Sequence, residues 1–165
     1  MSQESFFRRV NNPIKFKLFL LAKLPSAFFS GVRIRDADPD RCAVTIPYKW
    51  FTKNPFRSTY FACLSVAAEM STGILSMAHI QDRRPSLSML VVGLEANYFK
   101  KATGRTLFVC NDGRAIREVI ERAVATGEAT TVRACSVGSN EAGEVIAEFF
   151  ITWSFKIRKD IQATT

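Results

Sequence analysis

The chain has 165 residues, of which 47% are hydrophobic and 23% charged, a composition typical of one globular domain with its own apolar core. Lysine and arginine number 23 against 15 acidic residues, so the net charge is +8, which favours anionic partners such as nucleic acid, anionic lipid or coenzyme A. The basic residues are scattered singly or in pairs and form no nucleic-acid-binding motif, so we expect no nucleic-acid partner.

The four cysteines, Cys42, Cys63, Cys110 and Cys135, lie in apolar segments and have neither metal-ligand nor CxxC spacing. This usage indicates reduced, buried thiols, a cytoplasmic location and no metal site. Lysines and a proline interrupt the apolar stretch "KFKLFLLAKLPSAFF", so no secretory signal is expected. No run is expected to span a bilayer, which takes about 20 mostly apolar residues.

The first third of the chain predicts a helix and a hairpin. Residues 1 to about 12 form a polar start, and a short amphipathic helix then runs from Lys15 to Leu24, where Pro25 ends it. The alternation in "AFFSGVRIRDAD" predicts a strand. The turn "DADPD" and a second strand, "RCAVTIPYKW", complete a hairpin.

The segment "NPFRSTYFACLSVAAEMSTGILSMAH", residues 54–79, predicts a long helix. Asn54 is a favoured N-cap and Pro55 suits the first helical position. The helix is apolar almost all round, which is typical of a helix enclosed by other structure. Glu69 is its only carboxylate. Burial should raise the pKa of Glu69 unless hydrogen-bond donors compensate.

The rest of the chain is mainly β-structure with one surface helix. The helix has Asp112 as its cap and a glycine at its end. Together the elements predict an α+β fold in which one enclosed helix lies against a mainly antiparallel sheet. The predicted strands lie at 86–102, 105–111, 128–138 and 145–159, and the helix at 113–127.

This order of elements resembles the hotdog fold, in which a curved antiparallel sheet wraps one long central helix. Hotdog thioesterases of the phenylacetate-degradation type have an Asn in the loop before that helix, His-Gly-Gly near the helix start, and an acid nine residues after the His. Asn54 fills the loop position, Tyr60-Phe61-Ala62 the His-Gly-Gly position, and Glu69 the position of the acid.

Two further segments are similar to this family. "NYFKKATGR" resembles the strand and turn that follow the central helix, and "EAGEVIAEFFITW" resembles the final hairpin. The resemblance covers a core of about residues 28–158 and leaves 1–27 as a helical extension of a single domain, 1–165. It is strongest to a bacterial branch whose members carry the label of thioesterase or of a domain of unknown function.

The resemblance implies an acyl-thioester hydrolase. Glu69 would be the nucleophile or general base, and the backbone amide of Phe61 would stabilise the oxyanion. Asn54 and Tyr60 would orient the substrate or water. Because bulkier residues stand where the family has His-Gly-Gly, a non-catalytic protein that binds acyl chains or lipids remains the alternative.

The spacing of Phe61 and Glu69 has a consequence for assembly. Eight residues of helix separate them by about 12 Å along the axis, which is further than a glutamate side chain reaches. One carbonyl therefore cannot meet both groups of the same chain. If both act, two subunits must contribute to each site, which predicts a homodimer or a dimer of dimers, as the family resemblance also implies.

Three cations are candidates for binding the phosphates of a thioester of coenzyme A: Arg57, Lys100 and Lys101. The substrate could equally be carried by acyl carrier protein, and no separate cofactor is expected.

His79 is the only histidine, and exposure or the helix dipole accounts for it at the helix end. Its position at the helix end argues against two other enzyme classes. Hotdog dehydratases and hydratases pair a His with an acid in one site, and Ser-His-Asp hydrolases also need a His, but no other His is available.

Overall fold

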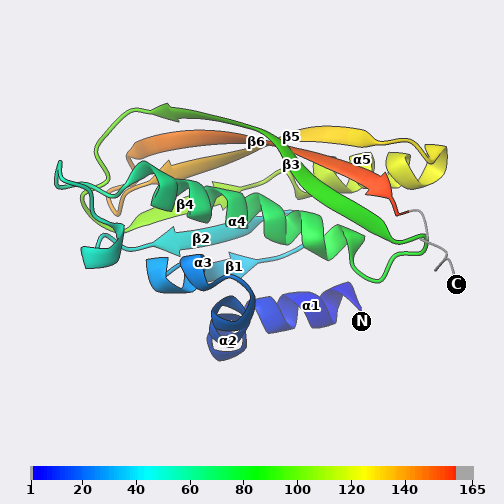
Figure 1. The fold of residues 1–165 in the computed structure, drawn as a ribbon, viewed down its shortest axis with the longest axis horizontal. Helices are drawn as coiled ribbons and strands as arrows, with labels where there is room; N and C mark the ends of the chain where they lie inside the picture. Colours follow the sequence, from blue (N-terminus) through cyan, green and yellow to red (C-terminus); the bar gives the residue numbers. More distant parts are fainter. Residues whose placement is uncertain (1, 159–165) are drawn as a thin grey trace, which may run out of the picture.

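The computed structural model describes residues 2–158, which form one antiparallel sheet and the helices that cover it (Figure 1). In chain order the elements are α1 (Gln3–Val10), α2 (Pro13–Lys23), α3 (Pro25–Ser30), β1 (Arg33–Ala37), β2 (Cys42–Ile46), the 3-10 helix η1 (Trp50–Thr52), α4 (Phe61–Ile80), β3 (Leu87–Tyr98), β4 (Thr106–Cys110), α5 (Gly113–Thr126), β5 (Thr130–Ser139) and β6 (Val145–Ile157).

The six strands lie in the order β1-β2-β4-β5-β6-β3, and every neighbouring pair is antiparallel. The sheet curves along α4, which contacts β2, β4, β5 and β6 (Figure 1). The predicted α+β class, the curved antiparallel sheet and the central helix are therefore confirmed, and the arrangement is compatible with the hotdog fold. The predicted β1–β2 hairpin is also confirmed.

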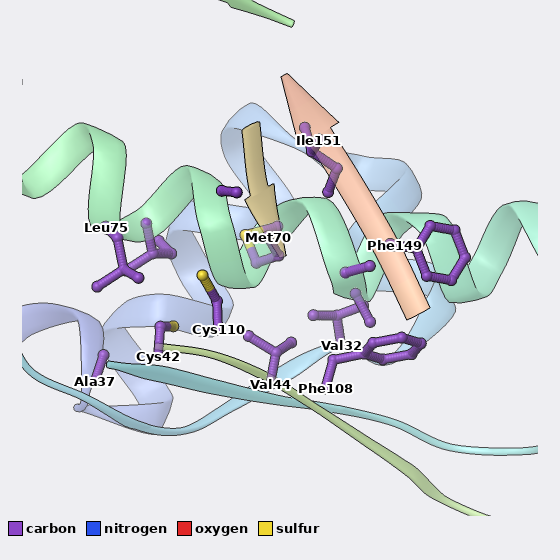
Figure 2. Packing of buried hydrophobic residues seen from close by; sticks show 14 of the residues in the cluster. Val32, Ala37, Cys42, Val44, Met70, Leu75, Phe108, Cys110, Phe149 and Ile151 are labelled. Atoms are coloured by element: carbon purple, nitrogen blue, oxygen red, sulfur yellow. The ribbon is translucent and has the colours of Figure 1, made fainter. Parts of the chain in front are cut away.

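The core lies between α4 and the concave face of the sheet. Figure 2 shows Met70 and Leu75 of α4 among side chains of the strands, including Val44 and Phe108. Phe108 and Phe149 are fully buried and meet edge to face, with ring centroids 5.6 Å apart. This enclosure explains why α4 is apolar almost all round.

The start of α4 differs from the prediction, because the helix begins at Phe61 and not at Asn54. The Asn54 side chain accepts hydrogen bonds from the amides of Phe56, at 2.9 Å, and Ser58, at 3.2 Å, so it caps a turn. Arg57 completes this turn in the left-handed region, with φ 58°. Asn-Pro is a start signal for turns as well as helices, and here the turn forms.

The apolar length of α4 also corrects an expectation. The helix is long and apolar enough to meet the criteria for a membrane span, although none was expected. Of its most apolar window, 67% is buried inside the fold. Burial against the sheet therefore explains the apolar composition of α4, and a position in a bilayer is not needed to explain it.

The N-terminal region is more helical than its sequence suggested. The Ser2 hydroxyl accepts a hydrogen bond from the Ser5 amide and caps α1, which lies where a polar start was expected. Residues 27–30 belong to α3 and not to the predicted strand, because Gly31 ends α3 with φ 80° before the strand begins. α2 matches the predicted helix and ends before Pro25.

Two smaller expectations need correction. Asp112 precedes α5 but makes no capping bond, since its carboxylate accepts the Cys135 amide at 2.6 Å. All four cysteines are free thiols, but only Cys42 and Cys110 are buried, while Cys63 and Cys135 are half-buried. Burial raises the pKa of the Cys110 thiol to about 12.

Candidate functional site

A cavity of about 630 Å³ opens at the N-terminal end of α4. Its walls are the loop before the helix, the first turn of the helix, and the segment that follows β3. The cavity brings together five of the residues predicted from sequence: Asn54, Tyr60, Phe61, Lys100 and Lys101. Arg57 and Glu69 do not line it.

The first turn of α4 offers unused backbone donors. Tyr60, the N-cap residue, makes no capping hydrogen bond with its side chain. Among residues 2–158, the amides of Phe61 and Ala62 donate no hydrogen bond. A helix start with free amides carries partial positive charge and suits an anion or a developing oxyanion.

Aromatic rings form much of the cavity wall. Tyr60 and Phe61 are 46% and 55% exposed, and their rings meet at a centroid distance of 4.9 Å. Tyr98 and Phe99 face the cavity from the end of β3 and the residue after it. Burial raises the pKa of the Tyr98 phenol. Such a wall suits the apolar part of an acyl chain.

Thr59 is a residue of the cavity wall that its sequence context did not mark as functional. The residue is 4% exposed, and its hydroxyl has no hydrogen-bond partner among the residues that the structure describes. Its amide donates to the Ala102 carbonyl at 2.8 Å. The predicted helix included Thr59, where a carbonyl four residues back would satisfy the hydroxyl, so no sequence signal pointed to it.

The three predicted cations differ in how they are engaged. Lys100 forms an ion pair with Glu144, and that hydrogen bond lowers the pKa of the Glu144 carboxyl. Lys101 is exposed on the cavity wall and forms no ion pair within the described chain. Arg57 is exposed in the neighbouring turn and is likewise unpaired there. Lys101 is therefore the wall cation free to meet an anion.

Glu69 lies about two turns along α4 from Phe61. Burial raises the pKa of its carboxyl, as its apolar surroundings predicted. The carboxylate has no hydrogen bond or ion pair with any of residues 2–158. A half-buried carboxylate with a raised pKa and no partner is typical of a functional site.

Gly73 creates the space in which the Glu69 carboxylate lies. A Cβ atom at position 73 would be 3.1 Å from Glu69 Oε1 and 3.4 Å from the Trp153 ring. The Trp153 indole is held in turn, since its N–H donates to the Thr72 hydroxyl at 2.9 Å. The carboxylate therefore lies against the surface of α4 at Gly73, a position that the Trp153 ring also approaches.

His79 is structural. It is 4% exposed, which excludes exposure, one of the two explanations that the sequence offered, and burial lowers its pKa. Its Nε2–H donates to the Pro39 carbonyl at 3.0 Å, and Nδ1 accepts from the side-chain amide of Gln3 at 3.1 Å. Both ring nitrogens are therefore used in joining α4 to α1 and to the β1–β2 turn.

Across residues 2–158, no three His, Cys, Asp or Glu side chains are grouped so as to hold a metal ion.

Comparison with known proteins gives a family match and a fold match. The sequence model of the domain of unknown function DUF4442 matches residues 14–155. No curated protein matches the sequence.

Several solved structures share the fold. A Pseudomonas aeruginosa protein of unknown function, described as a probable thioesterase, is 20% identical with a TM-score of 0.74, over 88% of this chain and 97% of its own. A Chlorobaculum tepidum protein of unknown function is 17% identical with a TM-score of 0.74, over 90% and 98%. A Haemophilus influenzae thioesterase is 14% identical with a TM-score of 0.59, over 88% and 92%. At such identities the likeness establishes the fold.

Proposed function

The chain belongs to the family of the domain of unknown function DUF4442, and we propose that it is an acyl-thioester hydrolase of the hotdog fold with sites formed between two subunits. The observation that carries the proposal is the Glu69 carboxylate, half-buried, with a raised pKa and without a partner in the described chain. Structural neighbours named as thioesterases support the same reaction class.

The reaction needs a hydrogen-bond donor to the developing oxyanion and a base. The thioester carbonyl oxygen would accept a hydrogen bond from the Phe61 amide, which has no acceptor within residues 2–158. Glu69 would take a proton from water as the water oxygen bonds to the carbonyl carbon. The C–S bond then breaks, and the proton passes to the departing thiolate, giving an acid and a thiol. In the alternative mechanism Glu69 is the nucleophile: its carboxylate attacks the thioester carbonyl and releases the thiol, and water then hydrolyses the resulting anhydride.

The two groups are proposed to meet across a dimer. Glu69 is absent from the wall of the cavity that holds Phe61, and about 12 Å of helix separates the two residues. The edge strand β3 supports a homodimer, because it is 12 residues long and exposes Leu90, Val92 and Leu94 by 66%, 54% and 49%. A long apolar strand edge is a template for pairing with another chain.

The cavity favours a substrate with an apolar acyl group and an anionic carrier. Aromatic rings would hold the acyl part, Asn54 and Tyr60 would orient the thioester or water, and Lys101 with Arg57 would meet phosphate. Lys100 would contribute only if its ion pair with Glu144 opens. Acyl-coenzyme A and acyl carrier protein both meet this description, both are available in the cytoplasm, and neither requires another cofactor.

Thiol release from a panel of acyl-coenzyme A substrates tests the proposal. We expect wild type to turn over at least one of them and Glu69→Gln to lose about 10²-fold or more in kcat, since the charged base is removed while the side-chain volume is kept. Circular dichroism and thermal unfolding check that the variant is folded. Equal rates for the two proteins would remove Glu69 from the mechanism.

A second candidate function is acyl binding without turnover. Tyr60 and Phe61 favour it, because their rings flank the amide at which the carbonyl must arrive. Calorimetry with the same acyl-coenzyme A panel distinguishes the two functions. Binding by both wild type and Glu69→Gln, with no thiol released by either, would establish the binding function and contradict hydrolysis.

A further inference from the structure

α2 is apolar on its outer face as well as its inner one. Phe16 and Leu20 are buried against the core, 6% and 1% exposed. On the opposite side Ile14, Leu18 and Leu21 are 71%, 61% and 48% exposed, and their spacing of four and three residues aligns them in one stripe. A helix that only covered the core would carry polar side chains there.

Lysines flank this stripe. At about 100° per residue, Lys15 and Lys17 lie on either side of Leu18. Both are exposed and neither forms an ion pair with a residue that the structure describes. The charge extends beyond α2, because residues 2–35 carry seven lysines and arginines against one acid, Glu4. Most of the net charge of +8 therefore belongs to this region.

Exposed aromatic rings continue the apolar surface. α3 contacts both α2 and η1, and its Phe29, 53% exposed, lies 6.1 Å from the Phe51 ring of η1. Trp50 is 79% exposed and lies 6.5 Å from the same ring. Tryptophan and phenylalanine at the border of an apolar surface suit the interfacial region of a bilayer.

We propose that α2 docks the protein onto an anionic membrane surface. Ile14, Leu18 and Leu21 would enter the boundary between headgroups and acyl chains, while Lys15 and Lys17 extend to the lipid phosphates. Basic residues near an anionic leaflet add to the binding that apolar burial begins. The helix would lie in the plane of the surface and would not cross it.

The charge distribution favours this occupant over two others. A second copy of the chain on the stripe would bring two strongly basic regions together, which is unfavourable. A nucleic acid would use the lysines but leave the leucines in water. The surface also lies beside β1, at the opposite end of the sheet from β3 (Figure 1), so docking and pairing through β3 are compatible.

Co-sedimentation of the full chain with vesicles tests the proposal. We expect binding to vesicles of phosphatidylcholine mixed with phosphatidylglycerol, little binding to phosphatidylcholine alone, and weakening by salt. Ile14→Ser/Leu18→Ser/Leu21→Ser and, separately, Lys15→Glu/Lys17→Glu should each reduce partitioning about tenfold or more.

Matched controls are exposed residues away from the N-terminal helices. Val145→Ser removes an apolar side chain that is 40% exposed on β6, and Arg122→Glu/Lys156→Glu changes the net charge as much as the lysine variant does. Both controls should bind as wild type does. Hydrolysis of soluble substrate without vesicles should be the same in all variants, which separates this proposal from the proposed activity.

Three outcomes would overturn membrane docking. The first is wild type remaining in the supernatant with anionic vesicles. The second is an equal loss of binding in the control variants, which would show a non-specific charge effect. The third is unchanged vesicle binding in the serine variant together with a changed elution volume in gel filtration, which would make the stripe an interface between copies of the chain.

Discussion

The Glu69 carboxylate destabilises the fold for as long as it is charged. Burial raises its pKa, and no cation or donor among residues 2–158 compensates. A raised pKa in the folded state means that the charged form is disfavoured there relative to the unfolded chain. The stability that Glu69 contributes when protonated is fully present below its unfolded pKa and is lost as the pH rises through the folded value.

Glu69→Gln should therefore raise the stability at neutral pH. We expect its melting temperature at pH 7.5 to exceed that of wild type by about 2–4 °C for each kcal/mol of unfolding free energy gained. The difference should shrink as the pH falls through the raised pKa of the folded wild-type carboxyl, and it should be smallest below the ordinary carboxyl value of 4.5. Calorimetric melting of both proteins across this range measures it. A variant less stable than wild type at pH 7.5 would show that the charge has a stabilising partner.

Gly73→Ala should lower turnover without unfolding the helix. The added Cβ would come within 3.1 Å of Glu69 Oε1, so the carboxylate must move, and small displacements of a reacting group are costly to the rate. Alanine is also the better helix former by about 1 kcal/mol. We expect kcat to fall about tenfold or more, with KM little changed and no fall in the melting temperature.

Gly104→Ala is the matched control for this substitution, because a Cβ at position 104 meets no atom within 4 Å. It should keep wild-type kcat. If Gly73→Ala also kept wild-type kcat, the position of the carboxylate over Gly73 would have no part in the reaction.

At the scale of single residues, the sequence was informative where a charged side chain stood in an otherwise apolar segment. An isolated acid in an apolar helix marked Glu69, and its raised pKa agrees with that prediction. Thr59 gave no such signal, since its buried hydroxyl without a partner results from the turn that precedes α4. The burial of the single histidine was not predicted either, because its partners on α1 and in the β1–β2 turn are distant in sequence.

At the scale of elements, the start of α4 decides what the cavity can bind. Phe61 is the first helical residue, and Tyr60 before it is extended, with φ −62° and ψ 133°. Proline is tolerated at the first helical position and favours an extended residue before it. The Phe61 amide can therefore be removed by substitution with little strain in the backbone.

Phe61→Pro compared with Phe61→Ala tests the amide as oxyanion donor. Both variants remove the aromatic ring, but only proline removes the N–H. We expect Phe61→Pro to lose about 10²–10³-fold in kcat relative to Phe61→Ala, as removal of one oxyanion donor does elsewhere, while both keep similar melting temperatures. Equal kcat values in the two variants would contradict a role for this amide.

The helices and strands that could be predicted are those whose signals lie within their own stretch of sequence. The strands after α4, the α5 helix and its terminal glycine, and the end of α2 at Pro25 follow from periodicity and turn chemistry. The start of α4 did not, because Asn54 can cap either a helix or a turn, and the left-handed Arg57 favours the turn. α1 was missed although its signals are local, since Ser2 caps the helix and Phe6, Phe7 and Val10 form its buried face.

At the scale of the whole molecule, the exposed edge of β3 should determine assembly. Leu90→Arg/Leu94→Arg places charges on a strand edge that pairing would bury, which protects edges against pairing in other proteins. We expect wild type to be at least a dimer and the variant to be a monomer by light scattering, with the loss of hydrolysis following the loss of the dimer. A monomeric wild type, or a fully active monomeric variant, would contradict composite sites.

Mixing two inactive variants tests the composite site more directly. In a symmetric dimer, each site would take the Phe61 amide from one subunit and Glu69 from the other. Phe61→Pro and Glu69→Gln homodimers each lack one group in both sites. A mixed dimer has one site with both groups and one site with neither. Random exchange makes about half of the dimers mixed, so about one quarter of all sites should hold both groups. We therefore expect about one quarter of the activity of a dimer in which both sites are intact. Mass spectrometry of intact dimers would establish that exchange has occurred. If exchange is complete and no activity returns, the amide and the carboxylate do not meet across the dimer, and the spacing along α4 needs another explanation.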